Sequence, residues 1–216
     1  MKVLHVLYSK IYTGAEKVAA QIIKAFEGRV DMAYCSLECE EVWEILDGMG
    51  IRHYGVEELT PATLSRVIRE YRPDVIHAHD WQSGMVPALL KIQYAHLPFY
   101  SKIKTVFTIH NLQYQGIFGI KEVQDVLGLG DSLWTNDKLE CFGCANYMKA
   151  ALVYSDVITT VSPSYAEEIQ TEYYGYRLDS VLRMNSYKLH GILNGINMDA
   201  FNPETDSKIF KNYGPN

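Results

Sequence analysis

Polar and glycine residues follow five predicted strands of this 216-residue sequence, at the point where each strand ends. Carboxylates, amides and imidazoles form hydrogen bonds to hydroxyl groups, and an indole ring can stack on a sugar. Because ligands bind outside the carboxyl ends of parallel strands, we expect the five groups to line one cleft. Their combination favours a polyhydroxylated ligand. The groups are Thr13-Gly14-Ala15-Glu16, His79-Asp80-Trp81-Gln82, His110-Asn111-Leu112-Gln113, Ser162-Pro163-Ser164 and Asn194-Gly195-Ile196-Asn197.

Other well-known catalytic motifs are absent from the sequence. No Gly-x-Gly-x-x-Gly follows the first strand, and neither a phosphate-binding P-loop nor a Gly-x-Ser-x-Gly nucleophile motif occurs. Gly14 and the helix that follows it favour an anion, because the free amides and the dipole of a helix N-terminus attract negative charge.

Cysteine and histidine residues give no strong indication of a metal site. Cys141 and Cys144 have the spacing of half a zinc site, but the other two cysteines lie far away in the sequence. We therefore interpret the thiols as buried or incidental. We expect His77 and His79 to point to opposite faces of their strand, and so predict no metal shared between them.

Strand and helix patterns alternate along the chain. Apolar, β-branched runs indicate buried strands, and apolar residues at helical spacing indicate helices between them. We predict an α/β fold with a doubly wound, Rossmann-like parallel sheet that has helices on both faces. Thr60-Pro61 and Ser162-Pro163 mark two helix starts. The predicted strands are 3–8, 30–36, 74–78, 104–109, 157–161 and 189–193, and the predicted helices are 15–26, 41–48, 60–71, 84–95, 143–155 and 162–173.

The segment 111–142 interrupts this alternation. It contains four glycines together with Tyr114, Phe118 and Trp134. A long segment of this composition is uncommon in a compact domain unless it has a function. From composition alone, a functional loop and a surface excursion packed by its own side chains are equally open.

Composition and charge limit the classes of partner. Lys and Arg total 20 against 26 Asp and Glu, which gives a net charge of −6 and argues against nucleic-acid binding. No apolar run is long enough for a transmembrane helix, and the first strand lacks the features of a signal peptide. Four cysteines suit a reducing compartment, so we expect a cytoplasmic protein.

Four motifs resemble those of the bacterial glycogen/starch synthases. They are HAHDWQSGMVPALLK at 77–91, TVFTIHNLQYQGIF at 105–118, ALVYSDVITTVSPSYAEEI at 151–169 and GILNGINMDAFNPETD at 191–206. The similarity runs from about residue 73 to the C-terminus. It implies a retaining transferase that moves glucose from ADP-glucose to the non-reducing end of an α-1,4-glucan. It also implies the GT-B fold, in which two doubly wound domains face each other across a cleft.

The resemblance assigns roles to individual residues. Asp80, His110 and Asn194 match family positions that hold the transferred sugar and the acceptor. The further positions that match substrate-binding residues are Gly14, Lys10, Trp81, Asn111, Gln115 and Gly116. The family has an aspartate where this chain has Asn197. The resemblance implies no metal and no cofactor, because ADP-glucose is a substrate.

Residues 1–73 fit the family less well. The synthases carry a Lys-Thr-Gly-Gly motif after their first strand, whereas here Lys10 lies two positions away from the matching site before Gly14. The run Gly-Ala-Glu-Lys-Val-Ala at 14–19 is more similar to the broader retaining GT-B transferases that modify lipids and other glycans. A divergent homologue, a natural recombinant and an engineered chimera are all consistent with this N-terminal edge.

We expect residues 1–216 to form a single N-terminal, acceptor-side GT-B domain without the nucleotide-binding domain that follows in the family. Such a chain would bind an α-1,4-glucan acceptor, would use the ADP-glucose donor only together with a C-terminal domain, and would be inactive alone. Its exposed interdomain face would allow self-association. Three alternatives stay open: a non-catalytic glucan-binding module, an isolated or recombined domain without ligand affinity, and a GT-B transferase for another sugar.

Overall fold

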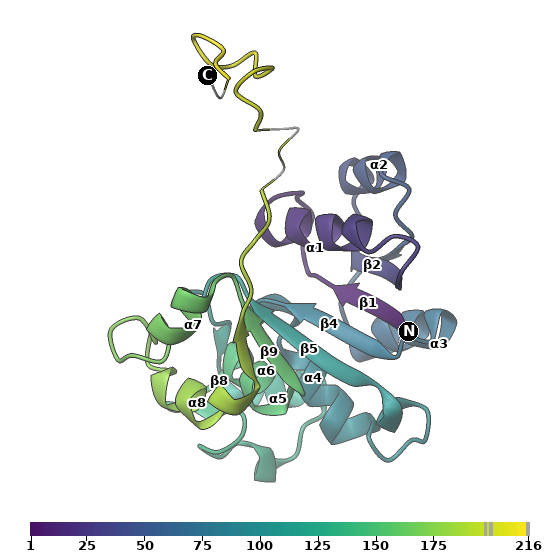
Figure 1. The fold of residues 1–216 in the computed structure, drawn as a ribbon. Helices are drawn as coiled ribbons and strands as arrows, with labels where there is room; N and C mark the ends of the chain where they lie inside the picture. Colours follow the sequence, from purple (N-terminus) through teal and green to yellow (C-terminus); the bar gives the residue numbers. More distant parts are fainter. Residues whose placement is uncertain (197, 199–200, 215–216) are drawn as a thin grey trace.

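A seven-stranded parallel sheet forms the centre of the protein, in the order β10-β9-β5-β4-β1-β2-β3 (Figure 1). The structure is a computed structural model, and it describes residues 1–196, 198 and 201–214. The strands are β1 (Lys2–Val6), β2 (Asp31–Leu37), β3 (His53–Val56), β4 (Val75–His79), β5 (Lys104–Ile109), β9 (Val157–Thr160) and β10 (Leu189–Gly191). The predicted doubly wound parallel sheet is confirmed. The prediction missed β3, whose sequence His-Tyr-Gly-Val lacks the apolar run that marks the other strands.

Helices cover both faces of the sheet (Figure 1). Alternate residues of β2 show the two sides, because Tyr34 packs against α1 and α2 whereas Ala33 and Cys35 pack against α3 and α4. Thr60 and Ser162 cap α3 and α7 as predicted, each by accepting a backbone N–H three residues later. The helices are α1 (Gly14–Ala25), α2 (Glu40–Gly48), α3 (Pro61–Tyr71), α4 (Met85–Leu89), α5 (Ile120–Leu127), α6 (Tyr147–Tyr154), α7 (Pro163–Glu168) and α8 (Asp179–Met184).

The segment 111–142 is folded rather than an open loop. It contains α5 and contributes to a small antiparallel sheet of β6 (Ile117–Phe118), β8 (Cys144–Asn146) and β7 (Glu140–Cys141). The predicted helix over 143–155 begins later than expected, at Tyr147, because the residues before it pair as a hairpin. Likewise, the predicted helix over 162–173 ends at Glu168, and the one over 84–95 divides into α4 and a wider turn over Leu90–Tyr94.

The strand order changes direction between β1 and β4. From β1 the chain proceeds outward to β2 and β3, and it then returns to place β4 on the other side of β1. In open α/β sheets such a switch point forms a crevice at the carboxyl ends of the strands, where ligands bind. The residues after β1, β4 and β5 therefore meet at one edge.

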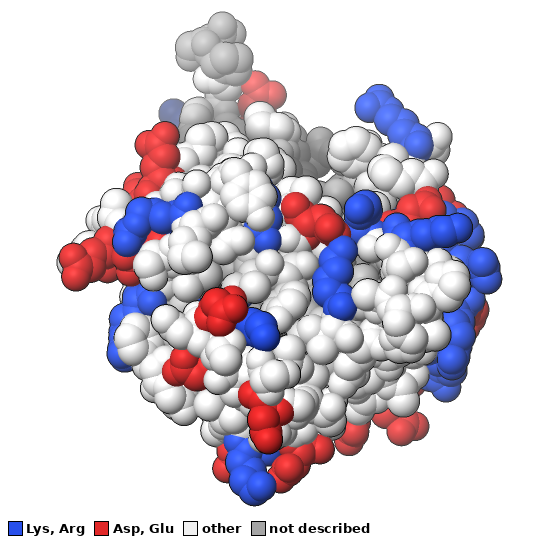
Figure 2. Space-filling model, turned by 90° about the horizontal axis from the view of Figure 1, so that it is seen from below, with Lys and Arg blue, Asp and Glu red and all other residues white. Residues whose placement is uncertain are grey.

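Residues 192–196, which follow β10, leave the sheet and run away from the body of the domain (Figure 1). On the face seen from below, Lys and Arg are interspersed with Asp and Glu, and uncharged surface lies between them (Figure 2). Among the described residues, no helix has the length and apolar character needed to cross a membrane.

Candidate functional site

Asp80 lies at the switch point in a strained backbone conformation. Its φ of 52° and ψ of 179° fall in a region that is almost restricted to glycine. Strain of this kind costs roughly 1–3 kcal/mol and is concentrated at functional sites. It directs the carboxylate across the strand ends, where Oδ1 accepts hydrogen bonds from the backbone N–H groups of His110 at 2.8 Å and Asn111 at 3.2 Å. Asp80 thus joins the end of β4 to the end of β5.

The environment shifts the protonation of both side chains. Burial raises the pKa of Asp80 to about 6, and the two backbone N–H groups partly oppose this shift. Burial lowers the pKa of His110 to about 4, with Glu16 of α1 opposing. At neutral pH the site therefore holds a carboxylate close to its titration range and a neutral imidazole.

Trp81 lies against the loop that precedes β6. A Cβ on Gly116 would stand 2.2 Å from Cε3 of the indole, so only glycine allows this approach. Gly116 also has a φ of 64°, which disfavours other residues. Phe118 packs on the indole with ring centroids 5.9 Å apart. The residues predicted from the strand end and from the loop are thus brought together as one aromatic surface.

Gln115 and Asn111 have different environments. The side chain of Gln115 is buried, with its amide donating to the carbonyl of Tyr176 at 2.9 Å and its oxygen accepting from Asn146 at 2.7 Å. These bonds hold the Gly116 loop in place. Asn111 is exposed, and its oxygen accepts the N–H of Gln113 at 3.0 Å. The predicted substrate contacts of both residues stay predictions.

A cluster of buried imidazoles lies behind His110. The prediction that His77 and His79 face opposite sides of their strand is wrong, because residues two apart in a strand share a face. Their rings stack with centroids 4.2 Å apart. His5 is the register partner of His77 on the neighbouring β1, and it lies on the same face.

The cluster has the spacing of a metal site, but most of its ring nitrogens already form hydrogen bonds. Nitrogens of His5, His77 and His79 lie within 4.8 Å of one another. However, both nitrogens of His79 form hydrogen bonds, to His5 and to His110, and Nε2 of His77 bonds to the hydroxyl of Thr108 at 2.6 Å. A metal ion would have to replace these hydrogen bonds. Cys141 and Cys144 face each other across the β7–β8 hairpin, and neither belongs to a metal-ligand cluster among the described residues.

The remaining predicted residues are less closely connected to Asp80. Gly14 opens α1 with a φ of 31° and open space around it, and Lys10 is exposed in the loop before it. Asn194 is exposed in the segment after β10, and no hydrogen bond joins it to Asp80 or His110 in the described part of the chain. Asn197 lies outside the described residues.

Comparisons with known proteins identify the family of this chain. The family model described as the starch synthase catalytic domain matches residues 53–184, which is more than half of the chain. The chain belongs to the starch synthase catalytic domain family. The family match begins at residue 53, within the N-terminal part that departs from the synthase motifs.

Two curated relatives are glycogen synthases. The protein of Geobacillus thermodenitrificans (strain NG80-2) is 55% identical over 144 residues, which cover 67% of this chain and 30% of that protein. The protein of Lachnospira eligens is 51% identical over 143 residues, which cover 66% of this chain and 30% of that protein. This starch synthase-family chain thus spans about 30% of the length of these relatives.

The fold also matches a solved structure over nearly its whole length. The catalytic domain of starch synthase IV from Arabidopsis thaliana, solved with ADP and acarbose bound, gives a TM-score of 0.80 at 23% sequence identity. The match covers 98% of this chain and 55% of that chain. The first 52 residues, which precede the family match, therefore still adopt the fold of a starch synthase domain.

Sequence reasoning missed two residues of the candidate site. His5 was treated only as part of a buried strand, although a histidine in an apolar strand is a polar group that needs a partner. Glu16 was noted only as a residue of the first loop, yet it acts electrostatically on His110. The pairing of β1 with β4 would have revealed His5, and that pairing is a property of the strand order.

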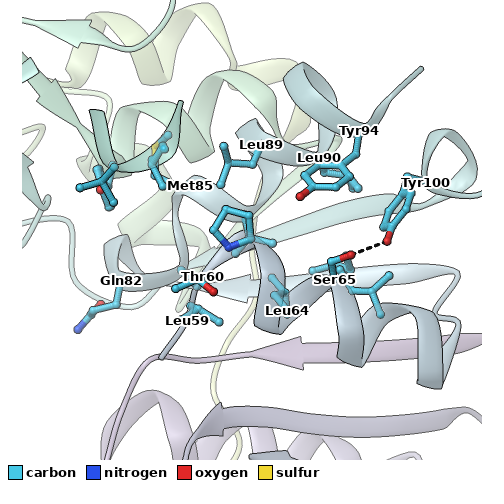
Figure 3. A pocket seen from close by; sticks show the side chains of 18 residues that line it. Leu59, Thr60, Leu64, Ser65, Gln82, Met85, Leu89, Leu90, Tyr94 and Tyr100 are labelled. Carbon is cyan, nitrogen blue, oxygen red and sulfur yellow. Dashed lines mark hydrogen bonds between the residues drawn. The ribbon is translucent and has the colours of Figure 1, made fainter. Parts of the chain in front are cut away.

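A separate, mainly apolar cavity of about 170 Å³ lies between α3 and the segment of α4 (Figure 3). Leu64 and Val86 belong to its lining, and the hydroxyls of Ser65 and Tyr100 bond to each other at 2.8 Å within it. Asp80 and His110 are not part of this lining. Because its walls offer few polar groups, the cavity does not suit a sugar.

Proposed function

We propose that this chain forms the acceptor side of a glucosyltransferase that moves glucose from ADP-glucose to an α-1,4-glucan. Membership of the starch synthase family supports this proposal, as do the curated relatives named glycogen synthase. The observation that carries it is the strained Asp80, whose carboxylate lies beside His110 at the switch point. Backbone strain of this kind is concentrated at functional sites.

The acceptor would lie on the aromatic surface. The indole of Trp81 offers a flat apolar face, and the Asp80 carboxylate has acceptor capacity left for a sugar hydroxyl. Gln115 and Gly116 act in this proposal by holding the loop against the indole rather than by direct contact. Asn194 is a further predicted contact on the sugar.

The donor would approach the N-terminus of α1. Thr13 makes no side-chain cap bond there, so the first amides of the helix are free for an anion such as a phosphate. Gly14 has open space around it. Lys10 could supply a positive charge from the same loop. The part of the relatives that this chain does not span would contribute the remaining donor contacts, and we therefore expect glucan binding without turnover by this chain alone.

We place the protein in the cytoplasm, because its four cysteines are free thiols, which suits a reducing compartment.

Calorimetric titration with a linear malto-oligosaccharide tests the proposal. We expect saturable binding that is lost in Trp81→Ala. Trp43→Ala is the matched control, because the Trp43 indole also packs closely on a glycine, Gly55. Trp43 belongs to α2, away from the switch point. Equal binding by both variants, or no binding by the unaltered chain, would contradict the proposed acceptor site.

A transfer assay separates an enzyme half from a binding module. The chain is mixed with a separately expressed C-terminal domain of a glycogen synthase, and glucose transfer from ADP-glucose is followed. Transfer that depends on both parts supports the enzyme. Persistent glucan binding without any transfer favours a non-catalytic glucan-binding module.

A further inference from the structure

Three histidines form a continuous hydrogen-bonded chain that leads from the core to the site. Nε2 of His110 lies 3.0 Å from Nδ1 of His79, and Nε2 of His79 lies 3.0 Å from Nδ1 of His5. His5 is fully buried and His79 is 2% exposed. Each bond needs one nitrogen with a proton and one without, so the three protonation patterns depend on one another.

The buried end of this histidine chain, at His5, decides which protonation pattern forms. Nε2 of His5 is buried and has no hydrogen-bond partner among the described residues. A buried N–H without an acceptor is rarer and more costly than an unused lone pair. His5 therefore carries its proton on Nδ1 and donates it to His79. The proton of His79 must then lie on its own Nδ1, from which it donates to Nε2 of His110.

His110 is consequently left with its proton on Nδ1. That nitrogen has no partner among the described residues, and the His110 side chain is only partly buried. We propose that His79 and His5 are positioning residues that fix His110 as the Nδ1–H tautomer, so that His110 presents a hydrogen-bond donor to a sugar oxygen. The sugar as recipient rests on the proposed function, whereas the tautomer does not.

The surroundings of the three hydrogen-bonded histidines favour their neutral state. His77 stacks on His79 with ring centroids 4.2 Å apart. A positive charge on either ring would therefore be opposed by desolvation and by any positive charge on the other ring. Burial keeps the pKa of His79 well below its ordinary value, with repulsion from His77, His5 and His110 adding to the effect. The three histidines, when neutral, can orient His110 without a counter-ion.

Nitrogen NMR of the imidazoles tests the tautomer directly. The chain is labelled with ¹⁵N-histidine, and two-bond and three-bond nitrogen–proton correlations are recorded at neutral pH. We expect Nδ1–H tautomers for His5, His79 and His110, with couplings across both N–H···N bonds. A His110 protonated on Nε2, or on both nitrogens, in the unaltered protein would overturn the proposal. This measurement does not depend on the folding of any variant.

Two variants separate positioning from packing. His79→Phe removes both bonds of the chain, and we expect His110 to change to Nε2–H, the form that free histidine prefers. His77→Phe is the matched control, since it alters the same face of the same strand outside the chain, and His110 should keep Nδ1–H. An unchanged tautomer in folded His79→Phe would refute the role of His79.

Glucan titration distinguishes this inference from the proposed function. If the donor on His110 contacts the sugar, His79→Phe should weaken malto-oligosaccharide binding by about tenfold, whereas His77→Phe should not. Equal affinities in both variants would overturn the role of the tautomer in sugar binding. Absence of binding in the unaltered chain would refute the proposed function, while the NMR spectrum would still decide the tautomer.

Discussion

Replacing His5 should change how the stability of the protein depends on pH. The ring is fully buried, and burial lowers its pKa from the ordinary 6.5 to about 4. The folded state therefore keeps His5 neutral, whereas the unfolded chain takes up a proton as the pH falls below 6.5. The contribution of His5 to the free energy of unfolding is complete above pH 6.5 and is lost progressively as the pH falls towards 4.

The size of the effect follows from the two pKa values. Between pH 7 and pH 5, the difference between about 4 and 6.5 corresponds to a loss of about 2 kcal/mol at 25 °C. His5→Phe removes the titrating group but keeps an aromatic ring in the sheet. Its free energy of unfolding should therefore fall by about 2 kcal/mol less than that of the unaltered protein over the same interval.

Urea unfolding at pH 7 and pH 5, followed by circular dichroism, measures the difference. His96→Phe serves as the control, because His96 is exposed. His5→Phe also removes the repulsion that His5 exerts on His77 and His79. Burial is the largest cause of the lowered pKa of both residues, so most of their contribution cancels in the comparison, as does that of Asp80. Parallel pH dependence in the unaltered protein and in His5→Phe would refute the inference that His5 is held neutral by burial.

Three further substitutions have defined expectations. Gly116→Ala should lower the free energy of unfolding by about 1–2 kcal/mol through left-handed strain, and should weaken malto-oligosaccharide binding in calorimetry by displacing Trp81. Gly128 has a φ of 62° and open space around it, so Gly128→Ala should show the strain alone and leave binding unchanged. Lys149→Met should cost about 1–3 kcal/mol in urea unfolding, because the buried amine donates to the backbone carbonyls of Asn136 and of Glu140 in β7. Val86→Leu should raise the unfolding midpoint by partly filling the 170 Å³ cavity, equivalent to about 0.5–2 kcal/mol, and a lower midpoint would contradict this.

Local patterns were sufficient for most of the sheet. Each of the six predicted strands corresponds to an observed one, because buried parallel strands are short, continuous apolar runs. The N-caps at Thr60 and Ser162 were also predictable, since a cap is a contact between residues three apart. The hairpin before α6 was not, because its short strands are stabilised by Ile117 and Phe118, which are distant in sequence.

The candidate site also contains residues that sequence could place and residues whose surroundings it could not. The sequence alone placed Asp80, Trp81 and His110 in one predicted cleft. Asp80 and Trp81 follow β4, His110 follows β5, and the carboxyl ends of parallel strands converge. The environment of Gln115 was not predictable, because its partners Asn146 and Tyr176 come from segments far along the chain.

The sequence alone determined that this protein is a parallel α/β domain with polar strand ends and starch synthase motifs. Only the tertiary structure decided that β1 lies beside β4 and that His5 thereby joins His79 and His110. It also decided that Trp81 packs on Gly116 and that Asp80 adopts strained backbone angles. The physical reason is that apolar periodicity specifies which residues a strand buries, whereas the order and register of strands specify which side chains meet.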